Sequence, residues 1–186
     1  MTKASCSCCS KINRRSFIGL TIGFGLVSSI NTTSARAEAI LTAASGGDES
    51  FMRLALEEAK RGDFPFGAVI VRDGKVMASG HNVGVRTNDP TAHGEITAIR
   101  NFISKYPSSD LRQATIYTTG EPCPMCMGAI LWCGFRRMVY AASIKDLSMR
   151  IGQIMIASPQ IANADHHNKI EITGGVLSAE ALALFK

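Results

Sequence analysis

Apolar and polar residues form short, regular blocks from residue 49 to the end of the chain. Over 49–61, apolar side chains recur at helical spacing, which predicts an amphipathic helix. Two strands are predicted at 67–71 and 76–80, because Asp73-Gly74 between them is a strong short signal for a hairpin turn. The chain therefore enters its main domain through a helix and a β-hairpin.

Strands and helices then alternate along the rest of the chain. Asp89-Pro90-Thr91-Ala92 and Glu121-Pro122-Cys123-Pro124 are helix-start signals, since Asp or Thr can cap a helix and Pro is tolerated at an early position. The elements predicted after the hairpin are a helix to about residue 104, a strand at 114–119, a helix through 134, a strand at 137–142, a helix at 148–157, a strand at 170–173 and a helix at 178–185. Strands that alternate with helices predict an α/β fold, a three-layer α/β/α sandwich with a mixed sheet of about five strands.

The first 37 residues differ from the rest in composition. They hold five basic residues and no acidic one, and an apolar run of fourteen residues occupies 17–30. With the small-residue ending Ala35-Arg36-Ala37, this is the pattern of a secretory signal, and the run is shorter than the roughly 20 residues that span a bilayer. We expect 1–37 to be a cleaved signal that leaves no stable membrane anchor, 38–48 a short linker and 49–186 one domain.

A motif inside this segment suggests the export route. Asn13-Arg14-Arg15-Ser16-Phe17-Ile18 resembles the twin-arginine motif, and the Gly-punctuated apolar run suits that pathway. A plastid transit peptide shares the lack of acids but has no such compact apolar core. The predicted targeting partner is the twin-arginine export machinery, and the predicted location is the periplasm.

The net charge of the whole chain comes from the same segment. The chain has 20 Lys and Arg against 15 Asp and Glu, a formal charge of +5. Without the five basic residues of 1–37, 15 residues of each sign remain and the formal charge is zero. Phosphate recognition usually needs a basic footprint. We therefore expect no nucleic-acid partner, although Arg136-Arg137 can be read as either a local patch or a solvated strand start.

Two short motifs carry the chemistry. His93-Gly94-Glu95 and Pro122-Cys123-Pro124-Met125-Cys126 supply one imidazole and two thiols. His93, Cys123 and Cys126 are three zinc ligands, and three protein ligands leave a fourth position open for water, as in catalytic zinc sites. Glu95 is spaced to handle a proton on that water rather than to bind the metal. This arrangement of H-x-E and P-C-x-x-C is the signature of zinc-dependent nucleobase deaminases.

The predicted helix starts suit these ligands. Cys123 and Cys126 would lie at a helix N-terminus, where the positive end of the helix dipole favours the thiolate. Their i, i+3 spacing places both sulfurs on one side of the turn. Both ligand-bearing helices follow strands, and α/β folds place ligands at one edge of the sheet.

Three other interpretations compete with a catalytic zinc site. A structural zinc needs a fourth ligand, and Cys133 lies roughly 10 Å further along the same predicted helix; His166 and His167 are more remote in sequence. Cys133 is most simply a core residue. A redox Cys-Pro-x-Cys pair is possible in an exported protein, but it leaves His93 and Glu95 without a purpose. The third interpretation is coincidence.

With these motifs in view, residues 49–185 resemble the cytidine deaminase-like superfamily, in its purine-deaminase branch. Residues 88–100 and 121–130 are similar to bacterial guanine deaminase, apart from Gly94, where Ala is more usual. We expect that glycine to be tolerated at a small cost in helix propensity. Residues 170–177 are similar instead to bacterial tRNA adenosine deaminase. The chain ends at Lys186, before the C-terminal extension that closes a partner's active site in guanine deaminase.

The resemblance implies hydrolytic deamination, with one Zn²⁺ per subunit, water as the second reactant and Glu95 moving protons. It implies that Asn82 and Asp146 hold the substrate. Phe66 could stack on the base or be a buried hairpin residue. For Asn82 the alternative is a turn residue, and for Asp146 it is a helix cap.

The expected substrate is a free purine base or nucleoside, with guanine favoured, and a homodimer is expected from the family. A tRNA-type adenosine deaminase is the enzymatic alternative. The alternative of another class is a periplasmic thiol–disulfide protein that uses Cys123 and Cys126.

Overall fold

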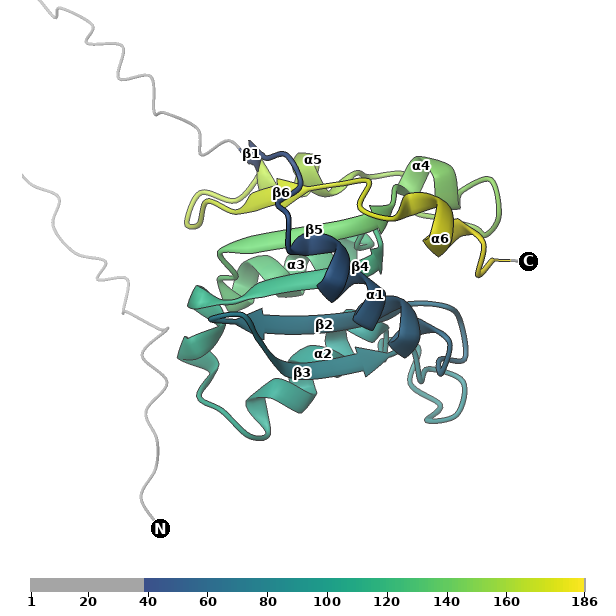
Figure 1. Cartoon of the computed structure of the whole chain (residues 1–186), viewed down its shortest axis with the longest axis horizontal. Helices are drawn as coiled ribbons and strands as arrows, with labels where there is room; N and C mark the ends of the chain where they lie inside the picture. Colours follow the sequence, from purple (N-terminus) through teal and green to yellow (C-terminus); the bar gives the residue numbers. More distant parts are fainter. Residues whose placement is uncertain (1–38, 186) are drawn as a thin grey trace, which may run out of the picture. The chain divides into compact units, whose positions relative to one another are not determined.

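A six-stranded mixed sheet forms the centre of the computed structural model, which describes residues 39–185 (Figure 1). The strands are β1 (Ile40–Leu41), β2 (Gly67–Arg72), β3 (Lys75–His81), β4 (Thr115–Gly120), β5 (Arg137–Ala142) and β6 (Glu171–Thr173). Their order across the sheet is β1-β6-β5-β4-β2-β3. β2 is antiparallel to both β3 and β4, whereas the pairs β4–β5, β5–β6 and β6–β1 are parallel. The predicted mixed sheet is confirmed, with six strands in place of about five.

Helices cover both faces of this sheet. They are α1 (Asp48–Ala59), α2 (Gly94–Ile103), α3 (Pro124–Cys133), α4 (Ile144–Leu147), α5 (Ser158–Ala162) and α6 (Ser178–Leu182), with a 3-10 helix at Ser108–Gln113. In Figure 1, α1 lies in front of the sheet and α2 and α3 lie behind it. The three-layer α/β/α sandwich is therefore confirmed. Within residues 39–185, no helix combines the length and apolar character that a bilayer crossing requires.

Neighbouring side chains of the central strands enter two separate cores. Ile116 and Met138 belong to the core beneath α2 and α3, whereas Tyr117 and Val139 belong to the core beneath α1 and α6. All four side chains are buried. Because successive residues of a strand point to opposite faces, the same two strands support both helical layers. The ends of these strands are thus held from both sides.

The segment 38–48, predicted as a linker, contains β1 and the first residue of α1. Ile40 and Leu41 pair in parallel with Glu171 and Ile172 of β6. Both side chains of this short edge strand are exposed, so backbone groups make the pairing and no apolar alternation marks it in the sequence.

The helix predicted for 148–157 is wrong, because the chain forms only turns and irregular structure between α4 and α5. Gly152 weakens a helix here by about 1 kcal/mol relative to Ala. The carboxylate of Glu121 also holds the backbone on both sides of this segment, at the first residues of α4 and α5. That carboxylate accepts hydrogen bonds from the backbone N–H groups of Ile144, at 2.8 Å, and Ser158, at 2.7 Å. Tertiary anchoring overrides the local apolar spacing.

A buried ion pair fixes the start of α1 to the strands. The fully buried Asp48 carboxylate accepts hydrogen bonds of 2.7 and 2.8 Å from the Arg137 guanidinium. Tyr117 Oη and the backbone N–H of Ser45 donate to the same carboxylate at 2.9 and 2.6 Å. Burial alone raises the pKa of Asp48, but the hydrogen bonds from Arg137, Ser45 and Tyr117 together lower it to about 2. Asp48 is therefore ionised at neutral pH.

Replacing Asp48 with Asn should destabilise the domain by about 3–5 kcal/mol at neutral pH, because Arg137 loses its buried partner. The pH dependence should change as well. The pKa of Asp48 in the folded state lies below the ordinary 3.8, so its carboxylate stabilises the wild type above about pH 4. This contribution, about 2 kcal/mol, is lost as the pH falls towards about 2, and D48N should lack it. Urea unfolding across this pH range measures both effects.

Glu49→Gln is a matched control, because Glu49 follows Asp48 in α1 and its 3.7 Å contact with Arg53 is exposed. It should change the free energy of unfolding by less than about 1 kcal/mol. If D48N proved as stable as this control, the buried pair would not be what holds α1 in place.

Candidate active site

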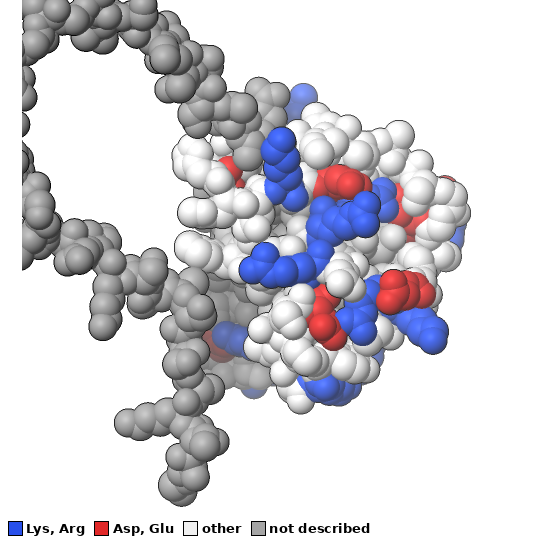
Figure 2. Space-filling view, turned by 90° about the vertical axis from the view of Figure 1, so that its left-hand side faces the viewer, with Lys and Arg blue, Asp and Glu red and all other residues white. Residues whose placement is uncertain are grey.

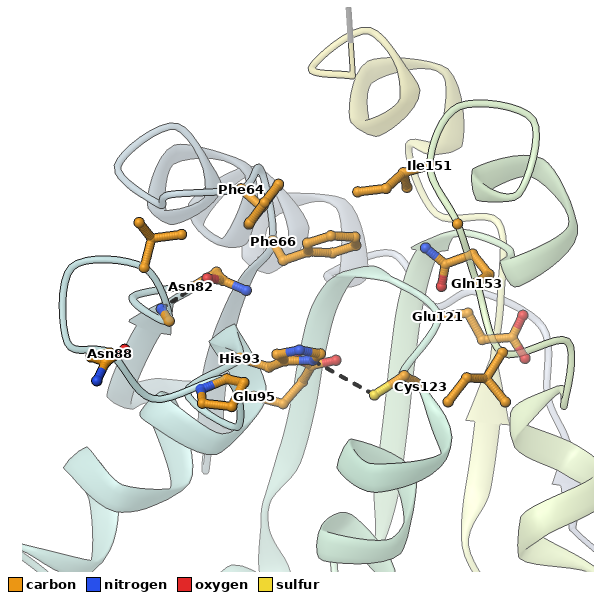
Figure 3. Close-up of a pocket in the computed structure, with 15 residues that line it drawn as sticks. Phe64, Phe66, Asn82, Asn88, His93, Glu95, Glu121, Cys123, Ile151 and Gln153 are labelled. Atoms are coloured by element: carbon orange, nitrogen blue, oxygen red, sulfur yellow. Dashed lines mark hydrogen bonds between the residues drawn. The ribbon is translucent and has the colours of Figure 1, made fainter.

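A cavity of about 700 Å³ opens beyond the carboxyl ends of β3 and β4. Its walls come from the turn before β2, the loop between β3 and α2, the connection from β4 to α3 and the segment between α4 and α5 (Figure 3). Ligands of α/β proteins bind outside the carboxyl ends of strands. The cavity therefore lies at the edge of the sheet that the two motifs predict.

The three predicted metal ligands meet at the floor of this cavity. His93 Nδ1 lies 3.6 Å from Cys123 Sγ and 3.5 Å from Cys126 Sγ, and the ligand atoms all lie within 4.8 Å of one another. Zn–N and Zn–S bonds of about 2.0 and 2.3 Å in a tetrahedron place neighbouring ligand atoms about 3.5–3.8 Å apart. The triad of His93, Cys123 and Cys126 thus has the chemistry and the spacing that a zinc ion requires.

Helix starts position all three ligands. His93 and Cys123 are the N-cap residues of α2 and α3, both in extended backbone conformation, and Cys126 lies in the first turn of α3. The helix predicted after the start signal at Asp89-Pro90-Thr91-Ala92 thus begins slightly later, at Gly94, with His93 just before its first turn. Gly94 follows His93, and a Cβ added there would lie 2.7 Å from the Phe66 backbone oxygen. This glycine allows α2 to approach the start of β2, a packing reason that helix propensity does not reveal.

The pKa values of the two thiols, Cys123 and Cys126, are shifted in opposite directions. A hydrogen bond from Cys126 is the main cause that lowers the pKa of Cys123 to about 4, and His93 contributes to the same shift. The hydrogen bond to Cys123, together with burial, raises the pKa of Cys126. The pKa of His93 is raised, chiefly by its hydrogen bond with Cys123. Cys123 is therefore the more acidic of the two thiols.

Glu95 lies in the first turn of α2 and lines the cavity beside the triad (Figure 3). It is only 6% exposed, and burial raises the pKa of its carboxyl group. A carboxyl group kept from bulk water beside the metal ligands is placed to exchange protons with a reactant in the cavity.

Two of the three predicted substrate residues line the same cavity. Phe66 and Asn82 are both part of its wall, from the turn before β2 and the end of β3. Asn82 Oδ1 accepts a hydrogen bond from the backbone N–H of Gly84 at 3.1 Å. Asn82 therefore also has the role of a turn residue, which the sequence offered as the alternative to substrate binding. Phe66 packs against Phe185 with ring centroids 5.1 Å apart.

Asp146 is not brought into the cavity. It is exposed in α4, and its carboxylate accepts a hydrogen bond of 2.6 Å from the Ser143 hydroxyl. The Asp146 backbone N–H in turn donates to Ser143 Oγ at 3.1 Å. The helix-cap alternative therefore describes its contacts, and the substrate role implied by the resemblance finds no support in this position.

The remaining candidates lie away from the triad. Cys133 ends α3 and packs, half-buried, against the core on that face. Across residues 39–185, the only group of three or more His, Cys, Asp or Glu side chains placed to hold a metal is the triad, so neither Cys133 nor His166 nor His167 completes a structural zinc site.

Sequence reasoning missed three polar residues of the cavity, Asn88, Glu121 and Gln153. Glu121 was considered only as part of a helix start, although it anchors the segment between α4 and α5. Gln153 lines the cavity from that segment. The position of Glu121 beside the Pro-Cys motif was an available signal, whereas Gln153 falls where a helix was wrongly predicted.

Residues 45–142 match the family described as the cytidine and deoxycytidylate deaminase zinc-binding region, and this match covers more than half of the chain. The chain belongs to this family. The protein is thus a zinc-dependent deaminase, and His93, Cys123 and Cys126 are the residues that would hold its zinc ion. Membership also sets aside the thiol–disulfide alternative, which has no use for His93 or Glu95.

Guanine deaminases and tRNA-specific adenosine deaminases are among the proteins to which this chain is similar. Guanine deaminase of Bacillus subtilis is 49% identical over 82 residues, which cover 44% of this chain and 53% of that enzyme, about half its length. A tRNA-specific adenosine deaminase of Haemophilus influenzae is 38% identical over 138 residues, covering 72% of this chain and 78% of the relative. A solved structure of guanine deaminase from Nitrosomonas europaea is 26% identical, with a TM-score of 0.66 and coverage of 91% of this chain and 97% of that one.

Zinc content tests the ligand assignment. The purified deaminase should carry about one zinc ion per chain, and Cys126→Ser should lose most of it, because a hydroxyl replaces a buried thiolate ligand. Elemental analysis after dialysis against a mild chelator measures the difference. Cys133→Ser, on the same helix, is the matched control and should keep its zinc. Equal loss from both variants would contradict the assignment.

Proposed function

We propose that this deaminase acts hydrolytically on a free purine base or nucleoside, with guanine favoured, and releases ammonia. The observation that carries the proposal is the position of Glu95. This buried carboxyl group lies beside the metal triad at the floor of a cavity that also presents Phe66 and Asn82 (Figure 3). The 49% identity to a guanine deaminase over 82 residues supports the choice of substrate.

The chain's own groups divide the work of the reaction. Zinc, when bound, lowers the pKa of a water molecule towards neutrality. The Glu95 carboxylate accepts a proton from the attacking water, whose oxygen adds to the ring carbon that bears the amino group. Glu95 gives that proton to the ring nitrogen. It then takes the proton of the newly added hydroxyl group and passes it to the amine, so that a C=O bond forms, the C–N bond breaks and ammonia leaves. Because the side chain is shielded from solvent, these protons stay within the site.

Phe66 and Asn82 are suited to hold a flat heterocycle. Phe66 offers a ring against which a base can stack, and its position is fixed by Gly120, where an added Cβ would lie 2.9 Å from Phe66 Cε1. Asn82 Oδ1 is occupied by Gly84 N–H, so its Nδ2 group is left to donate to an acceptor on the substrate. A stacking surface and one fixed donor orient the base above Glu95.

The tRNA-type alternative has one specific observation in its favour. The match to the tRNA-specific adenosine deaminase covers more of the chain, 72% against 44%, than the match to guanine deaminase. Charge argues against it. Residues 38–186 carry 15 Lys and Arg against 15 Asp and Glu, so the domain has no excess of basic residues. The face shown in Figure 2, on the side away from the carboxyl end of β3, also mixes Lys and Arg with Asp and Glu. Binding of RNA usually depends on a basic surface.

A substrate panel separates these two functions. Ammonia release should be fastest with guanine or its nucleoside, and slower with adenine, cytosine and their nucleosides. Because the reactions share one product, a single ammonia assay compares them, and inosine formation in tRNA is measured in parallel. Inosine in tRNA without ammonia from any free base or nucleoside would favour the alternative.

Glu95→Gln tests the proton transfers. The variant should keep its zinc, because Glu95 is not one of the triad, and kcat should fall by about 10²–10⁴, the usual contribution of general acid–base catalysis. Glu57→Gln, on the exposed surface of α1, is the control and should match the wild type. Loss of zinc from E95Q would mean that Glu95 had been assigned the wrong role.

We also propose that the enzyme is exported to the periplasm by the twin-arginine pathway. The predicted signal, 1–37, lies outside the described residues, so the support is the motif around Arg14 and Arg15. Export of a folded protein suits an enzyme whose thiols bind zinc in the reducing cytoplasm. Replacing Arg14 and Arg15 together with Lys should leave the protein in the cytoplasmic fraction of an expressing bacterium. Unchanged export would refute this route.

A further inference from the structure

The wall of the cavity opposite Asn82 carries an amide that the proposed mechanism does not use. Gln153 is half-buried, and its carboxamide points into the cavity across from Asn82 and above His93 (Figure 3). It takes part in none of the side-chain hydrogen bonds that residues 39–185 make among themselves. One acceptor oxygen and one NH₂ donor are therefore available to a ligand.

Gln153 is carried on a segment with fixed ends. Glu121 is 5% exposed, and its two carboxylate oxygens accept the backbone N–H groups of Ile144 and Ser158, on either side of Gln153. Ile151 packs against the core beneath α1 and α6 and also lines the cavity. The wall is thus formed before a ligand arrives, which reduces the ordering cost of binding.

The same wall offers few other polar contacts. Both oxygens of Glu121 are already in use, and the carboxylate of Asp146 is bonded to Ser143 at the exposed start of α4. Ile151 and Ile154, the neighbours of Gln153 in the lining, are apolar. A ligand that fills the cavity would therefore meet Gln153 as the hydrogen-bonding side chain of this segment.

A carboxamide complements a cyclic amide, or lactam, edge. Its oxygen accepts the ring N–H while its NH₂ donates to the neighbouring carbonyl, giving two parallel hydrogen bonds. In guanine, this N–H and C=O edge adjoins the carbon that bears the reactive amino group. Adenine presents only a ring nitrogen acceptor at the corresponding place. Gln153 can therefore pair fully with the first base and only partly with the second.

We propose that Gln153 is a specificity-determining residue, which selects aminopurines that carry a lactam edge beside the reacting carbon. The proposal rests on the proposed function for the reaction, but its recognition step can be measured without turnover. Hypoxanthine carries the lactam edge and no amino group, and unsubstituted purine carries neither. The difference in their affinities reports on the edge alone.

Binding of both compounds to the zinc-loaded enzyme, measured by calorimetry, tests the proposal. Wild type should bind hypoxanthine more tightly than purine. Gln153→Leu should lower the affinity for hypoxanthine by about tenfold to a hundredfold, as expected for two lost hydrogen bonds in a half-buried site. It should lower the affinity for purine by less than about threefold. Gln153→Glu keeps the acceptor and loses the donor, so its hypoxanthine affinity should fall between these values.

Met155→Ala is the matched control, because Met155 belongs to the same segment, is 60% exposed and does not line the cavity. It should bind both compounds as the wild type does. Zinc content and the thermal midpoint of each variant verify that the site is intact. If Q153L lowered the affinity for both compounds equally, or for neither, Gln153 would line the cavity without recognising the lactam edge, and the proposal would be overturned.

The outcome for guanine turnover is independent of this result. If Q153L loses the preference for hypoxanthine while the wild type releases no ammonia from guanine, the recognition stands and the proposed reaction fails. If the wild type deaminates guanine and Q153L does so with unchanged kcat/KM relative to adenine, the reaction stands and the role of Gln153 is refuted.

Discussion

The active site depends on where two helices begin. His93 and Cys123 are the residues immediately before the first turns of α2 and α3, so neither ligand can move unless its helix moves. α2 can lie close to the sheet because Gly94 has no side chain at its contact with Phe66. One close approach between backbones thus sets both the distance from His93 to the cysteines and the position of Phe66 in the cavity wall.

The two helix N-termini also favour negative charge on the side chains of the site. The triad lies at the N-termini of α2 and α3, where the partial positive charge of a helix start stabilises anions. The pKa of Cys123 is lowered to about 4, chiefly by the hydrogen bond from Cys126 and also by that from His93. Glu95 occupies the first turn of α2, where an acidic residue is also favoured. The site is therefore prepared for a cation of the size and charge of Zn²⁺ before one binds.

Local patterns in the sequence correctly predicted the elements whose conformation depends on residues close together in the chain. The Asp73-Gly74 turn, the strand at 137–142 and the helix starts at the two motifs are of this kind. The H-x-E and P-C-x-x-C motifs themselves identified the triad. The errors arose where distant residues decide. β1 forms because its backbone pairs with the edge strand β6. The segment 148–157 is irregular because Glu121 binds the backbone on both sides of it, at Ile144 and Ser158. No short window of sequence contains either interaction.

The residues predicted to bind the substrate also divide into those that local sequence places correctly and one that it does not. Asn82 and Phe66 adjoin strands whose positions the sequence predicts, and both line the cavity. Asp146 was transferred from a resemblance, but in this chain its carboxylate is bonded to Ser143 at the start of a four-residue helix. The resemblance implied that Asp146 helps to hold the substrate, but on this side the cavity is lined by the segment that follows α4, with Gln153 as its polar residue. The metal ligands are thus held by two helix starts, whereas Gln153, the residue proposed to select the base, lies on a separate segment between α4 and α5.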